Sequence, residues 1–167
     1  MKAGRRRFVQ AGIAGAIALA AAGAFLLPRG EGAGKRAGDR RALIAALAQA
    51  LLAGALPERS RADALAAVAG RVEQAIAALS APAQREVGEL LALLEFAPVR
   101  FALARIAVPW DRADEAEVAA FLERLRSSRL ALLQPAYHGL HDLVIGSWYA
   151  GRESWEAIGY PGPPELP

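Results

Sequence analysis

The chain of 167 residues contains no cysteine, which excludes disulfide bonds, thiolate metal ligands and thiol nucleophiles. It has only two histidines, His138 and His141, so imidazole chemistry is confined to one short stretch. Aromatic residues make up 7% of the chain, and none lies between Leu26 and Glu95. Hydrophobic residues nevertheless make up 54%, which excludes a disordered chain and suffices for one domain with its own core.

Acidic residues are missing from the first part of the chain. Lys2, Arg5, Arg6 and Arg7 carry four positive charges before the first acid, Glu31. The formal net charge of the whole chain is +3, so the remaining residues sum to −1. A nucleic-acid-binding domain carries its basic residues on the folded part, so this distribution argues against nucleic acid as a partner.

Residues 1–27 have the layout of an export signal, with a basic start followed by an uncharged run of 17 residues. The stretch "RRRFVQ" resembles the consensus of twin-arginine (Tat) signals, in which Arg5, Arg6 and Phe8 are the recognised residues. Two alternatives stay open. One is a Sec-type signal, and the other is retention as a membrane anchor, because 17 residues are close to the shortest span of a bilayer.

The rest of the chain has the periodicity of helices. Segment 28–40 is rich in glycine and charge, and we expect a flexible linker there. Beyond it, apolar residues recur at spacings of three and four, and no segment alternates like a strand. The prediction is an all-α fold: a small antiparallel bundle of about five helices in residues 41–150. A signal helix precedes it, and an irregular tail rich in proline and aromatic residues follows at 151–167.

Several residues predict where these helices begin and end. Ser60 and Ser80 are expected to cap the second and third helices. Asp114 and Glu117 have the spacing of a capping box, which opens a long helix that continues through Leu133. Pro135 is expected to kink or break that helix before the last one, which ends near residue 149.

Chemistry-bearing residues are few. His138, His141 and Asp142 lie within about one helical turn, a spacing that suits the start of a metal site or an acid–base pair. No clear third ligand accompanies them, so we expect a half-buried His141 and a surface pair between His138 and Asp142. No P-loop, nucleophile elbow or dinucleotide-binding glycine motif stands in its required context. We therefore expect no catalytic, metal-binding or cofactor-binding residues in this chain.

The aromatic residues near the C-terminus are the candidates for partner binding, because Trp and Tyr bury a large area at low entropic cost. The alternative is a tail that folds back over its own bundle. One of these residues, Trp148, is also expected to pack in the core. The candidate partner-binding residues are Tyr137, Trp148, Tyr149, Trp155, Tyr160 and Pro161.

The stretch "AYHGLHDLVIGSWYAGRESWEAIGYPGPP" at 136–164 resembles the C-terminal signature of a family of small subunits. These belong to membrane-bound, flavin-dependent sugar and polyol dehydrogenases, such as the sorbitol and fructose dehydrogenase small subunits and the third subunit of gluconate 2-dehydrogenase. The likeness rests on the pair Trp148-Tyr149, on Trp155, and on the run 159–163. The Tat-like leader agrees with that family.

The resemblance implies a non-catalytic small subunit, exported by Tat, that escorts and stabilises a large subunit carrying FAD. The implied partners are this large subunit, the Tat translocase during export and a cytochrome c subunit. The implied location is the periplasm, in association with the inner membrane. Two other readings stay open: a stand-alone periplasmic protein with a site at His138, His141 and Asp142, or an envelope scaffold anchored by its signal.

Overall fold

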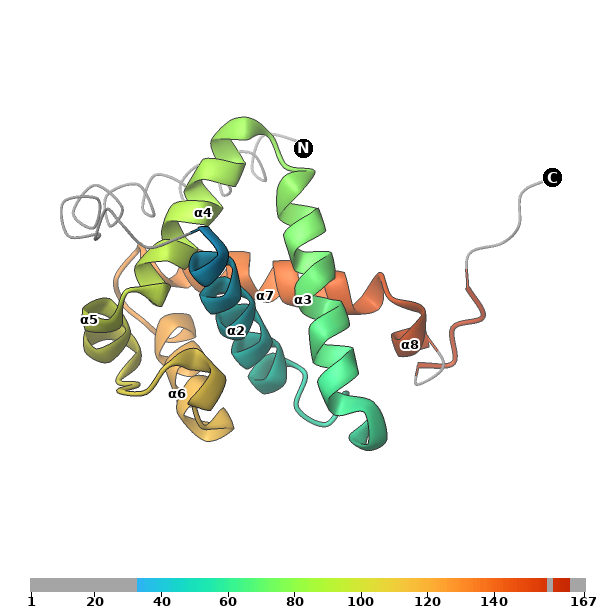
Figure 1. Ribbon diagram of the computed structural model, residues 1–167. Helices are drawn as coiled ribbons and strands as arrows, with labels where there is room; N and C mark the ends of the chain where they lie inside the picture. Colours follow the sequence, from blue (N-terminus) through green and yellow to red (C-terminus); the bar gives the residue numbers. More distant parts are fainter. Residues whose placement is uncertain (1–32, 156–157, 163–167) are drawn as a thin grey trace.

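The computed structural model describes residues 33–155 and 158–162, and every regular element within them is a helix (Figure 1). The all-α prediction is confirmed for this part of the chain, whereas the expected signal at 1–27 lies outside it. Among the described helices, none combines the length and the apolar character that crossing a membrane requires. The elements are α2 (Ala33–Leu51), η1 (Glu58–Ser60), α3 (Arg61–Ala77), α4 (Ala81–Glu95), α5 (Ala97–Val99), η2 (Arg100–Ala104), η3 (Trp110–Arg112), α6 (Glu115–Arg126), α7 (Leu133–Tyr149) and α8 (Arg152–Trp155).

Helix α2 lies at the centre of the molecule and contacts α3, α4, α6 and α7 (Figure 1). Its residues Leu43, Ile44, Leu47 and Ala48 are almost fully buried, because neighbouring helices cover more than one of its faces. Helices α2 and α3 run in opposite directions, as their short connection predicts. Helix α7 instead passes crosswise behind both of them, which departs from the expected antiparallel bundle.

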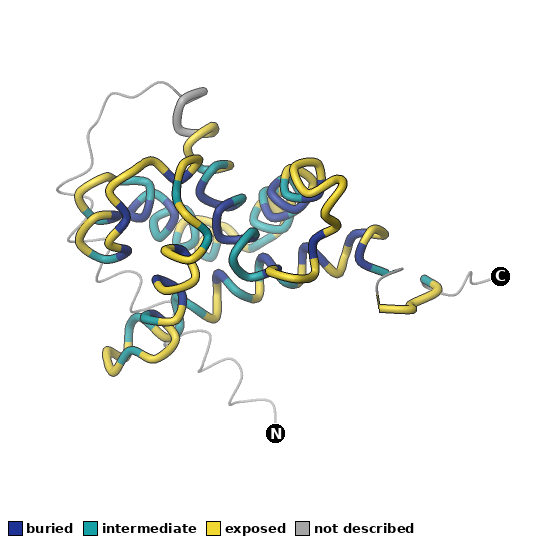
Figure 2. The backbone as a smooth tube through the Cα atoms, turned by 90° about the horizontal axis from the view of Figure 1, so that it is seen from below, coloured by how far each residue is buried: buried dark blue, intermediate teal, exposed yellow. Residues whose placement is uncertain are grey.

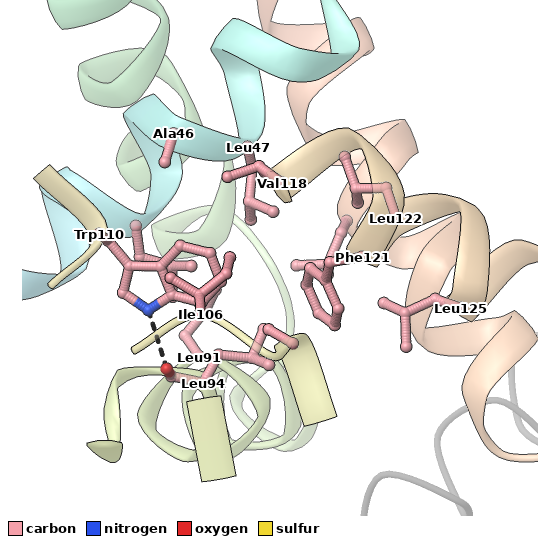
Figure 3. Packing of buried hydrophobic residues seen from close by; sticks show 13 residues of the cluster. Ala46, Leu47, Leu91, Leu94, Ile106, Trp110, Val118, Phe121, Leu122 and Leu125 are labelled. Atoms are coloured by element: carbon pink, nitrogen blue, oxygen red, sulfur yellow. Dashed lines mark hydrogen bonds between the residues drawn. The ribbon is translucent and has the colours of Figure 1, made fainter. Parts of the chain in front are cut away.

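The crosswise course of α7 follows from two core clusters that it bridges. The core cluster around Phe121 joins α2, α4 and α6, and its Trp110 ring lies 6.1 Å from Phe121 (Figure 3). The indole N–H of Trp110 donates to the carbonyl of Leu94 at 2.8 Å, so this polar atom is satisfied inside the core. The core cluster around Trp148 joins α2, α3 and α7. Since α7 supplies Leu140 to the first cluster and Trp148 to the second, it must span both.

Helix α2 begins at Ala33, inside the segment 28–40 that we expected to be a linker. Arg40 pairs with Glu95 of α4 at 3.1 Å, and the next arginine along the chain pairs with Glu73 of α3 at 2.9 Å. Most residues of this stretch also tolerate the helical conformation well. The linker prediction therefore does not hold for residues 33–40, which are helical.

The expected long helix from 114 through 133 is two helices, α6 and α7, separated by residues 127–132. The hydroxyl of Ser127 donates to a carbonyl of α6, and the hydroxyl of Ser128 accepts the N–H of Leu130. These local side-chain bonds replace helical bonds and end α6. Pro135 lies in the first turn of α7, where the missing N–H has no helical acceptor, so it helps to begin this helix.

The predicted capping residues precede their helices as expected, but not all of them make a capping hydrogen bond. The Oδ1 atom of Asp114 accepts the N–H of Ala116 at 2.8 Å and caps α6. Ser60 and Ser80 precede α3 and α4, yet neither side chain makes a capping hydrogen bond. Near Ser80, the side-chain amide nitrogen of Gln84 donates to two carbonyl oxygens at the end of α3 and just beyond it, and so satisfies acceptors that the helix leaves unpaired.

Candidate functional site

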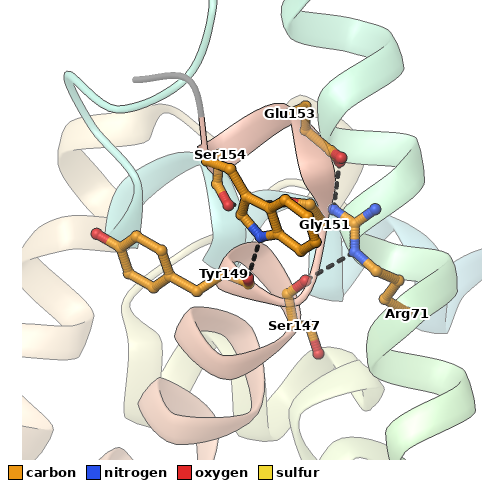
Figure 4. A network of polar contacts seen from close by, with 7 residues as sticks. Arg71, Ser147, Tyr149, Gly151, Glu153 and Ser154 are labelled. Carbon is orange, nitrogen blue, oxygen red and sulfur yellow. Dashed lines mark hydrogen bonds and ion pairs between the residues drawn. The ribbon is translucent and has the colours of Figure 1, made fainter. Parts of the chain in front are cut away.

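The C-terminal end of the described chain is fastened to the bundle by one arginine of α3. Arg71 donates from Nε to the carbonyl of Ser147 on α7 at 2.7 Å, and its Nη2 pairs with Glu153 on α8 (Figure 4). Gly151 lies against this guanidinium, and a Cβ there would be 2.6 Å from Cζ of Arg71. The hydroxyl of buried Ser154 donates to the carbonyl of Gly151 at 2.7 Å. Helix α8 therefore docks on its own bundle.

The contact between Arg71 and Glu153 depends on pH. Burial is the largest single influence on the pKa of Glu153 and raises it, but hydrogen bonds from its own backbone and from Arg71, together with the charge of Arg71, lower it overall. A carboxyl with a lowered pKa stabilises the folded state above its unfolded pKa of about 4.3, and this stabilisation disappears as pH falls through the folded pKa. The contact is therefore present at neutral pH and weakens in acid.

Trp155, at the end of α8, organises a small aromatic cluster with the residues that follow. Its indole N–H donates to the carbonyl of Tyr149 at 3.0 Å, and its ring meets that of Tyr160 edge to face at 5.4 Å. The N–H of Tyr160 donates back to the carbonyl of Trp155 at 2.9 Å. Gly162, with φ of +101°, brings its backbone so close that a Cβ would lie 3.1 Å from the indole. These contacts hold both rings in defined positions.

This cluster is the centre of a surface that we call the C-terminal aromatic surface, made of Tyr149, Trp155, Ile158, Tyr160 and Pro161. Tyr149 is 46% exposed, Ile158 57% and Tyr160 44%, while Trp155 is half-buried and Pro161 exposed. In Figure 2 the stretch that holds the last three residues is coloured mostly as exposed. Large apolar side chains exposed close together mark surfaces that bind other molecules.

The structure separates the predicted partner-binding residues into two groups. Trp148 is 2% exposed and lies in a core cluster, so the prediction that it contacts a partner does not hold, because its own fold covers the ring. Tyr137 lies about 18 Å before Tyr149 along α7 and packs against the histidine rings. Tyr149 and Tyr160 both contact Trp155, and exposed Pro161 follows Tyr160 in the chain.

Three residues that support this surface were missed at the level of sequence. Arg71 reaches its partner from 82 positions away, and no local pattern signals such a contact. Ile158 lies between a charged stretch and a glycine-rich stretch, and it belongs to no periodic pattern of apolar residues. Gly151 had a signal, because a glycine directly after a helix often marks a close approach or a change of direction.

The histidine group is arranged differently from the prediction. Nδ1 of His141 lies 3.1 Å from Oδ1 of Asp142, so the pair is formed by neighbours and not by His138. The half-buried position of His141 is as predicted, and the residue borders a shallow hollow of about 240 Å³ between α2, α6 and α7. Within the described residues, no three histidine or acidic side chains are grouped closely enough to hold a metal ion.

The export-signal residues Arg5, Arg6 and Phe8 lie outside the described residues, so the Tat signal stays a prediction. Comparison of the chain with protein-family profiles, with curated proteins and with solved structures gives no significant match. The fold, the C-terminal aromatic surface and the resemblance in sequence are therefore the grounds on which a function can be proposed.

Proposed function

We propose that this chain is a non-catalytic small subunit that escorts a FAD-dependent sugar or polyol dehydrogenase through the Tat pathway. At the periplasmic face of the inner membrane it then stabilises that large subunit. The observation that carries the proposal is the C-terminal aromatic surface. It lies in the segment whose sequence resembles the small subunits of such dehydrogenases, and it exposes Tyr149, Ile158 and Tyr160 to solvent.

The C-terminal aromatic surface is organised before any partner binds. Trp155 is held by Tyr149, Tyr160 and the backbone at Gly162, so its ring loses little conformational freedom on binding. Aromatic anchors of this kind carry most of the binding free energy at protein interfaces. Arg71 fixes the base of the surface to α3, so the anchors have a defined place on the bundle.

The remaining roles belong to other chains. The large subunit holds FAD and oxidises the sugar or polyol, and a cytochrome c subunit accepts the electrons. The Tat translocase reads Arg5, Arg6 and Phe8 and exports the two subunits together. In this arrangement the small subunit provides the surface that binds the large subunit and the signal that directs export, and it provides no catalytic group.

Co-purification tests the partner. A tagged copy of the chain is expressed together with a leaderless FAD-dependent sugar or polyol dehydrogenase, and the flavin absorbance of the captured protein is measured. We expect capture by the unmodified chain and by the control Phe101→Ala, whose ring is 64% exposed on a different element. We expect loss of capture by Trp155→Ala with Tyr160→Ala. Capture of no flavoprotein by the unmodified chain would remove the basis of the proposal.

Export is tested separately. Replacing Arg5 and Arg6 by Lys keeps the charge but removes the paired arginines that the translocase reads, so both subunits are expected to stay in the cytoplasm. Dehydrogenase activity is measured in periplasmic and cytoplasmic fractions. An active dehydrogenase in the periplasm of this variant would contradict the escort role while leaving the binding role intact.

The contact between His141 and Asp142, beside a hollow at the α2–α6–α7 junction, favours a second candidate: a stand-alone periplasmic protein with a metal or acid–base site. Metal analysis of the purified chain distinguishes the two. Stoichiometric zinc or iron that disappears in the His138→Ala, His141→Ala double variant would favour this candidate.

A further inference from the structure

Arg152 of α8 lies beside the C-terminal aromatic surface, and its side chain is exposed. Its Cζ atom is 5.8 Å from the centre of the Trp155 ring, which is within the range of a cation–π interaction. A guanidinium meets a ring with its face, whereas its N–H donors point outward in its own plane. The contact with Trp155 therefore places the charge and leaves the donors of Arg152 available to another molecule.

Arg152 is the charged residue of α8 that the fold does not pair. Glu153, its neighbour in the same helix, forms an ion pair with Arg71 of α3 (Figure 4). Within residues 33–155 and 158–162, by contrast, no carboxylate lies within ion-pairing distance of Arg152. The described part of α8 and its ion pair with α3 therefore leave one positive charge uncompensated.

This charge lies where a partner has to come close. The Trp155 ring is 5.4 Å from the ring of Tyr160, and its indole nitrogen is 3.0 Å from the carbonyl of Tyr149. Because Arg152 lies at a similar distance from the same ring, a protein that covers the two tyrosines also removes water from the guanidinium. A cation that loses water without gaining a counter-charge costs free energy, so a partner that fits this surface has to supply one.

We propose that Arg152 is a specificity-determining residue of the C-terminal aromatic surface, and that the large subunit presents a carboxylate to it. The partner surface is then apolar where it covers Tyr149 and Tyr160 and acidic at the edge that meets Arg152. A carboxylate can accept two parallel hydrogen bonds from a guanidinium, which fixes orientation as well as charge. A basic residue at the same position would repel the chain, so the pair also selects against wrong partners.

This inference rests on the proposed function, since it names the chemistry of the surface that the large subunit offers. Association and dissociation rates of the full chain with the purified FAD-dependent large subunit are measured between about 0.05 and 0.3 M salt, a range over which screening changes strongly. The variants are Arg152→Gln, which removes the charge, and Arg152→Lys, which keeps it. The matched control is Arg85→Gln, an exposed arginine of α4 that also has no ion pair among the described residues.

We expect Arg152→Gln to lower the association rate about three- to tenfold at low salt and to weaken its salt dependence, because charges at the edge of an interface act mainly on these two quantities. Arg152→Lys is expected to keep the salt dependence, and Arg85→Gln is expected to leave both quantities unchanged. If Arg152 served only to hold Trp155 in place, its loss would speed dissociation without changing the salt dependence. That result would overturn the proposal.

A charge exchange locates the carboxylate. Arg152→Glu is expected to bind more weakly than Arg152→Gln, and replacing one acidic residue of the large subunit by lysine is expected to restore its association. No restoring position among the surface acids of the large subunit would contradict a direct pair. The same losses in Glu156→Gln would assign the partner of Arg152 to its own chain and would also overturn the proposal.

The two proposals fail in different ways. Binding of the large subunit that is unaffected by Arg152→Gln would remove the role of Arg152 and leave the proposed function in place. No binding by the unmodified chain would remove both.

Discussion

Trp148 and Trp155 lie seven positions apart in the chain, but different interactions hold them. Trp148 is 2% exposed and is surrounded by apolar side chains of α2, α3 and α7. Trp155 is half-buried and is held by one hydrogen bond to Tyr149, one aromatic contact with Tyr160 and the backbone of Gly162. The interior is stabilised by apolar area removed from water, whereas the C-terminal segment is positioned by a few directed contacts.

This difference separates stability from binding. Residues of the core clusters are inaccessible to other molecules, and their loss leaves cavities. Residues of the C-terminal aromatic surface are exposed or half-buried, and their loss is expected to leave the bundle folded. Replacing a large aromatic residue by alanine is therefore expected to lower the stability of the fold when the residue lies in the core. At the C-terminal aromatic surface, the same replacement is expected to lower the affinity for a partner.

The largest effect is expected from Trp148→Ala, which we predict lowers the free energy of unfolding by about 3–5 kcal/mol because it leaves a large cavity in the core. The matched variant Trp155→Ala is predicted to lower it by less than about 1 kcal/mol. Denaturant titration followed by circular dichroism measures both. Similar losses for the two variants would show that the C-terminal segment is part of the cooperative core.

A smaller effect is predicted for Gly151→Ala. Its Cβ would lie 2.6 Å from Cζ of Arg71 and 2.5 Å from the carboxylate of Glu153. Both are the far ends of flexible side chains that can move aside, so the expected loss of stability is below about 1 kcal/mol, while the contact between them is displaced. The displaced contact frees α8, so amide protons of residues 152–155 are expected to exchange faster with solvent. The control is Gly139→Ala, where a Cβ meets nothing within 4 Å. Unchanged exchange in Gly151→Ala would contradict the role of Arg71 as the fastening residue.

The smallest effect is predicted for acid. As pH falls through the folded-state pKa of Glu153, which is lowered by its hydrogen bonds and by the charge of Arg71, protonation weakens its contact with Arg71. Amide exchange at α8 is therefore expected to rise on acidification relative to exchange in α2. The Glu153→Gln variant is expected to show faster exchange at α8 already at neutral pH, without this additional rise. A rise of the same size in the variant would assign the pH dependence to another group.

Periodicity was sufficient to predict the all-α class. Leu47, Val68, Phe121, Leu140 and Val144 all lie on the apolar faces that their spacing predicts, and all are buried. Boundaries were less predictable, because they depend on contacts between distant segments. Helix α2 starts at Ala33, inside the expected linker, and hydroxyl groups after α6 end that helix before Pro135 is reached.

Only the types of residue in the candidate site were predictable from the sequence. Trp and Tyr near a proline-rich end identified Trp155 and Tyr160 as anchors. The spacing of apolar residues in α7 predicts that Trp148 can face the core. It does not predict that the surrounding helices cover the ring so fully that no partner can reach it. Arg71 could not be found at all, because its role depends on the crossing of α3 and α7, which no local pattern predicts.

The most direct test of the account is a paired measurement on the double variant Trp155→Ala, Tyr160→Ala: its affinity for the purified FAD-dependent large subunit and its free energy of unfolding. We predict a Kd at least about 30-fold higher, corresponding to the loss of one or more anchor residues, with an unfolding free energy within about 1 kcal/mol of the unmodified chain. Unchanged affinity in a folded variant would contradict the claim that the C-terminal aromatic surface binds a partner. A variant that loses both affinity for the large subunit and free energy of unfolding would show that these rings stabilise the fold.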